Sequence, residues 1–157
     1  GLDLGSGGRR RVKELHRSAL VPFSSEQMFR LVDDVPAYPE FLPWCVAAEE
    51  QCRDPELVVA RLELERARVR QGFTTRNRLH PPDRIEMELV DGPFSTFRGR
   101  WEFRALDPGA CKVSLDLAFE FAGRVGRLAG AALLTDAADR LVDAFCARAR
   151  SLYGGRS

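Results

Sequence analysis

Regular alternation of apolar and polar side chains runs through CKVSLDLAFEF, residues 111–121. Alternation of this length predicts a half-buried strand in an antiparallel sheet that has one wet face. Turn signals such as Asp107-Pro108-Gly109 separate this stretch from its neighbours. Further strands are predicted at 11–21, 57–65, 69–79, 84–90 and 97–103. The chain is therefore constrained to form a sheet whose apolar face needs a cover.

The apolar period becomes helical from Leu128 to Tyr153, and Gly154-Gly155 ends the pattern. This is the only predicted element long enough to cover the sheet. A shorter helix, SSEQMFRLVDD, begins at a cap formed by Ser24 or Ser25 and stops at Val35-Pro36. We expect the apolar face of the long helix to consist of Leu134, Ala138, Leu141, Val142, Phe145, Ala149 and Leu152.

These elements predict an α+β fold, in which a curved antiparallel sheet of about six to seven strands grips a long C-terminal helix. Two short helices are expected after the first strand. Residues 9–157 are long enough for one domain, and GLDLGSGG at 1–8 is expected to be a flexible leader or an expression-tag remnant.

Charge and cysteine content exclude several classes of protein. The net charge of +1 gives no reason to expect DNA as a partner, so any nucleic-acid binding must come from a local patch. The four cysteines form no CxxC pair and no zinc spacing, which favours reduced thiols in a cytoplasmic protein. The longest apolar run, LAGAALL, is far below the roughly 20 residues of a membrane span.

No catalytic or metal-binding constellation is present in the sequence. His16 and His80 are expected to be solvated and unpaired. Asp33-Asp34 is interpreted as a helix-ending turn, and Glu49-Glu50 as two strand neighbours that face opposite ways. GRVGRLAG at 123–130 lacks the ending of a phosphate-binding loop and is interpreted as a flexible joint. We therefore expect neither an enzyme nor a metal site.

Aromatic side chains are the remaining candidates for function. A strongly curved sheet closed by one helix has more concave face than that helix can fill, so we expect an apolar cavity. Gln71, Thr75 and Asn77 would add polar groups to its lining. The predicted cavity residues are Phe41, Trp44, Phe73, Met87, Phe94, Trp101, Phe103, Leu117, Phe119 and Phe145.

The segment YPEFLPWC, residues 38–45, concentrates apolar side chains between two prolines and is too broken for a helix. It belongs to LVDDVPAYPEFLPWC, which resembles the signature of the START-like family of mitochondrial coenzyme Q-binding proteins and bacterial ribosome association toxins such as RatA. DGPFSTFRGRWEF, CKVSLDLAFEF and LVDAFCARA match the same family in the same order.

The resemblance implies the helix-grip fold, in a superfamily that also includes polyketide cyclase/dehydrase-like proteins. That activity does not follow from the fold. The prolines would hold the segment as a kinked passage into the second strand, with Phe41 and Trp44 across one mouth of the grip. The family-motif positions are Tyr38, Pro39, Phe41, Leu42, Pro43, Trp44, Cys45, Gly92, Pro93, Phe94, Trp101, Phe119, Phe121, Asp143, Phe145, Arg148 and Ala149.

Two functions follow from the resemblance. The first is non-enzymatic binding of an isoprenoid quinone such as ubiquinone in support of respiration, without any other cofactor. The alternative is association with the large ribosomal subunit that blocks subunit joining. For the alternative, the candidate rRNA patch is Arg66, Arg68, Arg70, Arg76 and Arg78, a run without any acid. Strand parity predicts that all five guanidinium groups lie on the wet face, opposite Val69, Phe73 and Leu79.

Overall fold

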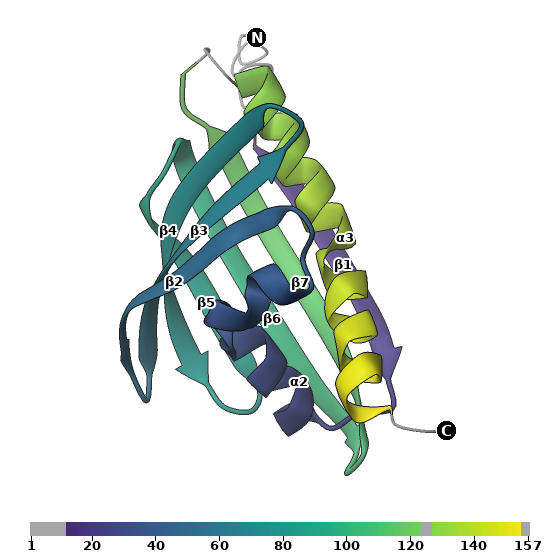
Figure 1. Cartoon of the computed structure of the whole chain (residues 1–157). Helices are drawn as coiled ribbons and strands as arrows, with labels where there is room; N and C mark the ends of the chain where they lie inside the picture. Colours follow the sequence, from purple (N-terminus) through teal and green to yellow (C-terminus); the bar gives the residue numbers. More distant parts are fainter. Residues whose placement is uncertain (1–11, 124–126, 155–157) are drawn as a thin grey trace, which may run out of the picture.

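The structure is a computed structural model that describes residues 12–123 and 127–154. It consists of one curved sheet with a long helix along its concave side (Figure 1). In chain order the elements are β1 (Lys13–Val21), α2 (Ser25–Asp33), the 3-10 helix η1 (Val35–Glu40), β2 (Cys45–Asp54), β3 (Leu57–Arg66), β4 (Val69–His80), β5 (Arg84–Asp91), β6 (Phe94–Asp107), β7 (Ala110–Phe121) and α3 (Arg127–Tyr153).

The sheet has the strand order β1-β7-β6-β5-β4-β3-β2, and every neighbouring pair is antiparallel. The strands from β2 to β7 follow one another as hairpins. The first strand of the chain, β1, lies at the edge of the sheet and pairs with the last strand, β7. The connection from β1 to β2 carries α2 and η1. These features confirm the predicted α+β helix-grip fold. Within the described residues, no helix is long and apolar enough to cross a membrane.

The sequence leaves two candidates, Ser24 and Ser25, for the residue that caps α2. Ser24 is the N-cap residue: its hydroxyl accepts from the backbone N–H of Gln27 at 3.1 Å, and the Gln27 side chain accepts from the N–H of Ser24 at 2.9 Å. Ser25 is buried instead. The expectation that prolines exclude a helix from YPEFLPWC was wrong for its first residues, which lie in η1. Pro36 lies near the start of η1, where a backbone N–H has no helical partner, and Pro39 lies inside η1, which ends one residue later at Glu40.

Helix α3 buries most of the face that the sequence predicts, but not its last member. Leu152 is 50% exposed, and the neighbouring Tyr153 packs on Phe23 with ring centroids 5.9 Å apart. Gly154 follows the helix, as expected, and its N–H donates to the carbonyl of Arg150 at 2.9 Å. Residues 127–130 of the predicted joint belong to α3, while 124–126 and the predicted leader at 1–8 lie outside the described residues.

Ion pairs attach α3 to both sides of the sheet. Asp139 pairs with Arg17 of β1, the edge strand at one side. Asp136, on the preceding turn, pairs with Arg66 at the end of β3, near the other side. The helix is therefore fastened to two strands that do not touch each other, which fixes its position over the apolar face.

All four cysteines are free thiols, as the sequence predicts, and Cys45, Cys111 and Cys146 are buried. Burial raises the pKa of Cys45 and of Cys111 to about 11 because the thiolate would lose its hydration. Cys52 is exposed on β2. The buried thiols therefore behave as small apolar side chains of the core.

One glycine in the β5–β6 turn is required by close packing. A Cβ atom added at Gly92 would lie 2.7 Å from Cβ and 3.4 Å from Cα of Phe73. Both atoms are held by the backbone of β4 and cannot rotate away. At Gly109, in the β6–β7 turn, the nearest atom to an added Cβ would be a carboxylate oxygen of Asp107 at 3.9 Å.

We therefore expect Gly92→Ala to lower the free energy of unfolding by about 1–3 kcal/mol through overpacking. Gly109→Ala is the matched control and should change it by no more than about 0.5 kcal/mol. Urea unfolding of the two variants measures the difference. Equal stability of both variants would contradict the close contact.

A second prediction concerns alkaline pH. In the unfolded chain, cysteine thiols ionise near pH 8.5, whereas Cys45 and Cys111 stay neutral in the fold to about pH 11. Ionisation thus favours the unfolded state between these values, and the free energy of unfolding should fall as the pH rises through that window. Urea midpoints from pH 7.5 to 10.5 measure the fall. It should be smaller in the double variant Cys45→Ala/Cys111→Ala than in the wild type, with Cys52→Ala as a control substitution at an exposed cysteine.

Candidate functional site

A partly open cavity lies between the concave face of the sheet and α3. Its volume is about 100 Å³, and its wall comes from η1, from strands β2 to β7 and from α3. Pockets that hold drug-sized ligands span about 300–1,000 Å³, and a cavity of about 150 Å³ accepts benzene. In this conformation the cavity is therefore too small for an isoprenoid quinone.

The structure places eight of the ten predicted cavity residues on this wall: Trp44, Phe73, Met87, Phe94, Trp101, Leu117, Phe119 and Phe145. The other two lie elsewhere. Phe103 is 1% exposed and packs between Phe29 and Trp101, with centroid distances of 5.7 and 6.1 Å. Phe41 packs edge-on against Phe145 and is not part of the cavity wall. The prediction did not include several further wall residues, among them Tyr38, Leu62, Leu134 and Leu141, although the last two lie on the predicted apolar face of the helix.

Aromatic packing explains why the cavity is small. Phe94 contacts Phe73, Phe97 and Phe119 at centroid distances of 5.7, 5.1 and 6.0 Å. Rings at these distances are in van der Waals contact and fill the end of the grip near the β5–β6 turn. Most of the surplus concave face is thus occupied by the protein's own side chains.

Few polar groups reach the cavity wall. The hydroxyl of Thr75 donates to the side-chain oxygen of Asn77 at 2.8 Å, and both residues line the cavity, as the strand parity predicts. Gln71, the third predicted polar residue, lies near Gly130 of α3 and not on the wall. Tyr38 donates from its hydroxyl to the carbonyl of Val32, and burial raises the pKa of this phenol well above its usual range.

The YPEFLPWC segment packs against the C-terminal half of α3 through its aromatic side chains. Tyr38 and Phe41 both contact Phe145 edge-on, with centroids 5.4 and 5.1 Å away. The guanidinium of Arg148 lies 4.9 Å from the ring centroid of Phe41 and pairs with Glu40 at 2.7 Å. This cluster explains why the segment is so rich in apolar residues.

Other family-motif positions serve the turns and the surface. Pro39, Pro43 and Asp143 are exposed, whereas Cys45 is buried at the start of β2. In the β5–β6 turn, Gly92 packs on Phe73, and the carbonyl of Pro93 accepts from the N–H of Ala122 at 2.8 Å. Cys45, Gly92 and Pro93 therefore contribute to packing and to the β5–β6 turn. Only part of the family motif lies at the cavity.

The five predicted patch arginines do not share one face. A two-residue turn, Ala67-Arg68, separates β3 from β4, and Arg66 pairs with Val69 across it. Paired residues face the same side, so Arg66 lies on the inner side and reaches Asp136 of α3. The parity argument was wrong here because it counted through a turn as if the strand continued.

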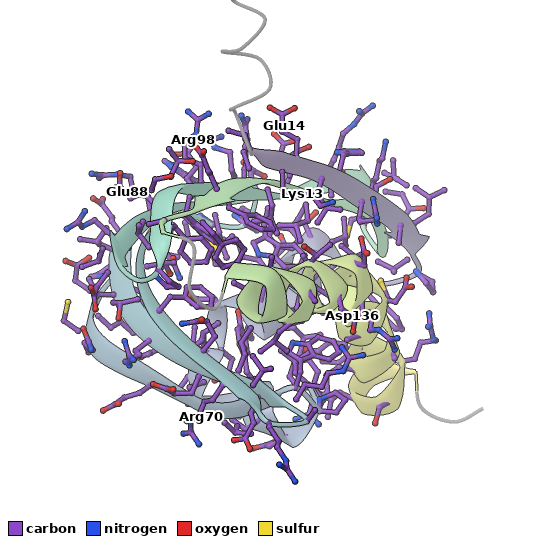
Figure 2. All side chains as sticks on the ribbon, turned by 90° about the horizontal axis from the view of Figure 1, so that it is seen from above. Lys13, Glu14, Arg70, Glu88, Arg98 and Asp136 are labelled. Carbon is purple, nitrogen blue, oxygen red and sulfur yellow. The ribbon has the colours of Figure 1, made fainter. Side chains whose placement is uncertain are left out.

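The remaining arginines of the patch lie apart from one another. Arg70 points outward at the start of β4 and pairs with Glu65 at 3.1 Å (Figure 2). Arg78 follows eight residues later, which corresponds to roughly 25 Å along a strand. Arg76 pairs with Glu88 at 3.2 Å, and Arg78 faces Glu86 in the register. Only Arg66, Arg68 and Arg70 therefore lie at the β3–β4 turn.

A surface groove of about 230 Å³ lies beside that turn. We call it the Trp44 groove; it is lined by Pro43, Trp44, Glu65, Arg66, Asp136 and Arg140. Trp44 also lines the internal cavity, so its ring forms part of the wall between the two. Arg66 and Arg140 both donate to Asp136, and mainly the Arg66 guanidinium holds the pKa of that carboxyl below its usual value.

A larger open groove of about 670 Å³ crosses the outer face of the sheet. Charges alternate in sign across the strands that form it, as the register Arg78–Glu86–Arg100–Asp116–His16 shows. Glu14, Glu88 and Arg98 lie on this outer side, away from α3 (Figure 2). The alternation stabilises neighbouring strands and leaves no continuous region of one sign.

Both histidines have carboxylate partners, so the expectation that they are unpaired was wrong. His16 Nδ1 lies 2.6 Å from Asp116, a residue of the neighbouring strand that is 100 positions away in the sequence. His80 Nε2 lies 3.4 Å from Glu86. His16 is exposed, as predicted. Across the described residues, no group of three or more His, Cys, Asp or Glu side chains is arranged to hold a metal ion.

Comparisons with known proteins agree with this architecture. The chain is 46% identical over 140 residues to the ribosome association toxin RatA of Pseudomonas aeruginosa, which covers 89% of this chain and 97% of that protein. It is 28% identical over 109 residues to the mitochondrial coenzyme Q-binding protein COQ10 of Drosophila melanogaster, covering 67% of this chain and 45% of that protein.

Solved structures share the fold at low sequence identity. The ZhuI aromatase/cyclase of Streptomyces sp. R1128 superposes with a TM-score of 0.78 at 19% identity, covering 94% of this chain and all of that one. A START superfamily protein of Mycobacterium smegmatis gives 0.72 at 23% identity, covering 88% of this chain and 98% of that one. The sequence model described as polyketide cyclase/dehydrase and lipid transport matches residues 21–146. The chain therefore belongs to this START-like family, together with the RatA proteins.

Proposed function

We propose that the protein acts by binding to the ribosome and not by catalysis. The observation that carries the proposal is its 46% identity to a ribosome association toxin over nearly the full length of both chains. Similarity to the coenzyme Q-binding protein is weaker and spans less than half of that relative. The small internal cavity also favours a function at the surface over storage of a large ligand.

Following the family resemblance, we propose the large ribosomal subunit as the partner, and interference with subunit joining as the consequence. A ribosome-binding role fits the cytoplasmic location that the sequence predicts. It also needs no catalytic group, which suits a fold whose concave face is filled mainly by aromatic and aliphatic side chains.

The prediction is tested by co-sedimentation of the purified protein with isolated bacterial ribosomal subunits. The protein should pellet with large subunits at low salt and remain in the supernatant with small subunits. Because RNA binding releases counterions, the affinity should fall steeply as the salt concentration rises. Added before the subunits are mixed, the protein should lower the fraction of joined ribosomes. A protein that stays in the supernatant at every salt concentration would exclude this function.

Binding of a hydrophobic ligand is the second candidate, and one feature of the cavity favours it. The Thr75–Asn77 hydrogen bond places two polar groups on an otherwise apolar wall, where they could meet the polar head of a quinone. Such binding requires the cavity to open beyond its present 100 Å³.

For this candidate, a short-chain ubiquinone should quench the fluorescence of Trp44 and Trp101 saturably, with an affinity near micromolar, about −8 kcal/mol. Thr75→Val keeps the shape of the side chain and removes the hydroxyl, so it should weaken binding. Thr74→Val is the matched control, because Thr74 lies on the outer side near Arg61. Linear quenching without saturation in the wild type would remove the quinone as a ligand.

A further inference from the structure

Resting on the proposed ribosome association, we propose that the Trp44 groove is the contact site for an exposed nucleotide of ribosomal RNA. The base would stack on the indole of Trp44. Arg66 and Arg140, with Arg68 at the adjacent turn, would contact the phosphates on either side. Neither the fold nor the similarity to RatA assigns this surface; the arrangement of these side chains does.

Arg66 and Arg140, the two arginines of the groove, are held in place by Asp136 but keep free hydrogen-bond donors. Arg66 and Arg140 come from different elements, β3 and α3, and donate to the two oxygens of the same carboxylate, Asp136. A guanidinium group has five N–H donors, so most donors of both side chains remain available. The Arg66 side chain is 50% exposed and that of Arg140 is 62% exposed, so these donors face solvent. Asp136 thus orients two cations at the groove while leaving the trio with a net positive charge.

The surroundings strengthen that charge. Arg68 occupies the β3–β4 turn, is exposed, and has no ion-pair partner among the described residues. The carboxylate of Glu65, the other acid of the groove, already pairs with Arg70 at 3.1 Å. Arg70 also pairs with Glu63 at 3.3 Å. Four arginines therefore meet three carboxylates at this end of the sheet, and a phosphate group would find unused donors on Arg66, Arg68 and Arg140.

Trp44 supplies the flat apolar surface that RNA recognition requires. Proteins bind unpaired nucleotides by stacking bases on aromatic rings and pairing phosphates with basic side chains. The backbone carbonyl of Trp44 accepts from the N–H of Glu65 at 2.8 Å, which fixes the residue beside Arg66. The groove volume of about 230 Å³ is below the range of drug-sized pockets and suits a single planar ring.

The larger outer groove is a poorer site for RNA, despite its greater volume. Its arginines alternate with carboxylates across the strands, so a phosphate beside Arg100 would also approach Asp116 and Glu86. Among the described residues that line it there is no Phe, Tyr or Trp, and its imidazole, that of His16, is bonded to Asp116. This contrast provides a matched control for the experiment.

The first test compares two double variants in co-sedimentation with large ribosomal subunits across a salt series. Arg68→Gln/Arg140→Gln removes two charges at the Trp44 groove. Arg76→Gln/Arg100→Gln removes two charges from the outer face, where these arginines pair with Glu88 and Glu102. The slope of log affinity against log salt should flatten by about 1.4–1.8 units in the first variant and stay at the wild-type value in the second.

The second test addresses stacking. Trp44→Leu keeps an apolar group toward the cavity but removes the ring, and should weaken subunit binding about 5- to 150-fold. Trp44→Phe should restore most of the affinity, since it retains an aromatic face. Urea unfolding of each variant verifies that it is folded, and the arginine pair tests the site independently if Trp44→Leu does not fold.

The outcomes separate this inference from the proposed function. If the wild type does not bind large subunits, ribosome association fails. If the wild type binds and the two double variants weaken binding equally, the charge effect is not specific to the groove and the inference is wrong. If Trp44→Leu binds as tightly as the wild type, no base stacks there and the inference is also wrong.

Discussion

Coverage of the concave sheet face by α3 is the contact on which the rest of the structure depends. The face carries a continuous apolar row from every strand between β3 and β7, and exposing it would cost about 25 cal/mol for each Å² of apolar surface. One helix must cover this face, so its position has to be fixed. The ion pairs Arg17–Asp139 and Arg66–Asp136 fasten the helix to two separate strands. Phe145 of the helix also packs edge-on against the rings of Tyr38 and Phe41.

The same coverage decides where function can be located. The sequence predicts a ligand cavity between sheet and helix, but Phe73, Phe94, Phe97 and Phe119 fill much of that space and leave about 100 Å³. A cavity of this size suits a packed core more than a quinone site. The outside of the grip, in contrast, has charged side chains held in fixed geometry. The small cavity and the ordered surface charges thus favour a site on the surface over the interior site that the sequence predicts.

The sequence predicts the architecture well because alternation reports directly on a half-buried strand. It predicts β7 nearly residue by residue, and for β6 it predicts residues 97–103 of the observed Phe94–Asp107. It expects a second strand after YPEFLPWC, with Glu49 and Glu50 in a strand, but gives that strand no bounds. The reason is that β2 is an edge strand with mostly exposed residues, so CVAAEEQCRD has no clear apolar face. It also cannot report contacts between distant residues, such as His16 with Asp116. The prediction of one arginine patch was wrong for a local reason. The turn at Ala67-Arg68 reverses the chain and places Arg66 on the inner face.

The acidic residues of α3 show why charge along a sequence differs from charge on a surface. In TDAADR, at 135–140, two aspartates stand beside one arginine, a composition that argues against a helix facing RNA. In the fold, Asp139 is paired with Arg17 and Asp136 with both Arg66 and Arg140. Each carboxylate is therefore balanced by a guanidinium from a strand, and Asp136 holds two. The aspartates that appear to repel a phosphate along the sequence instead fasten the helix and orient the arginines, because pairing in the fold decides which charges face outward.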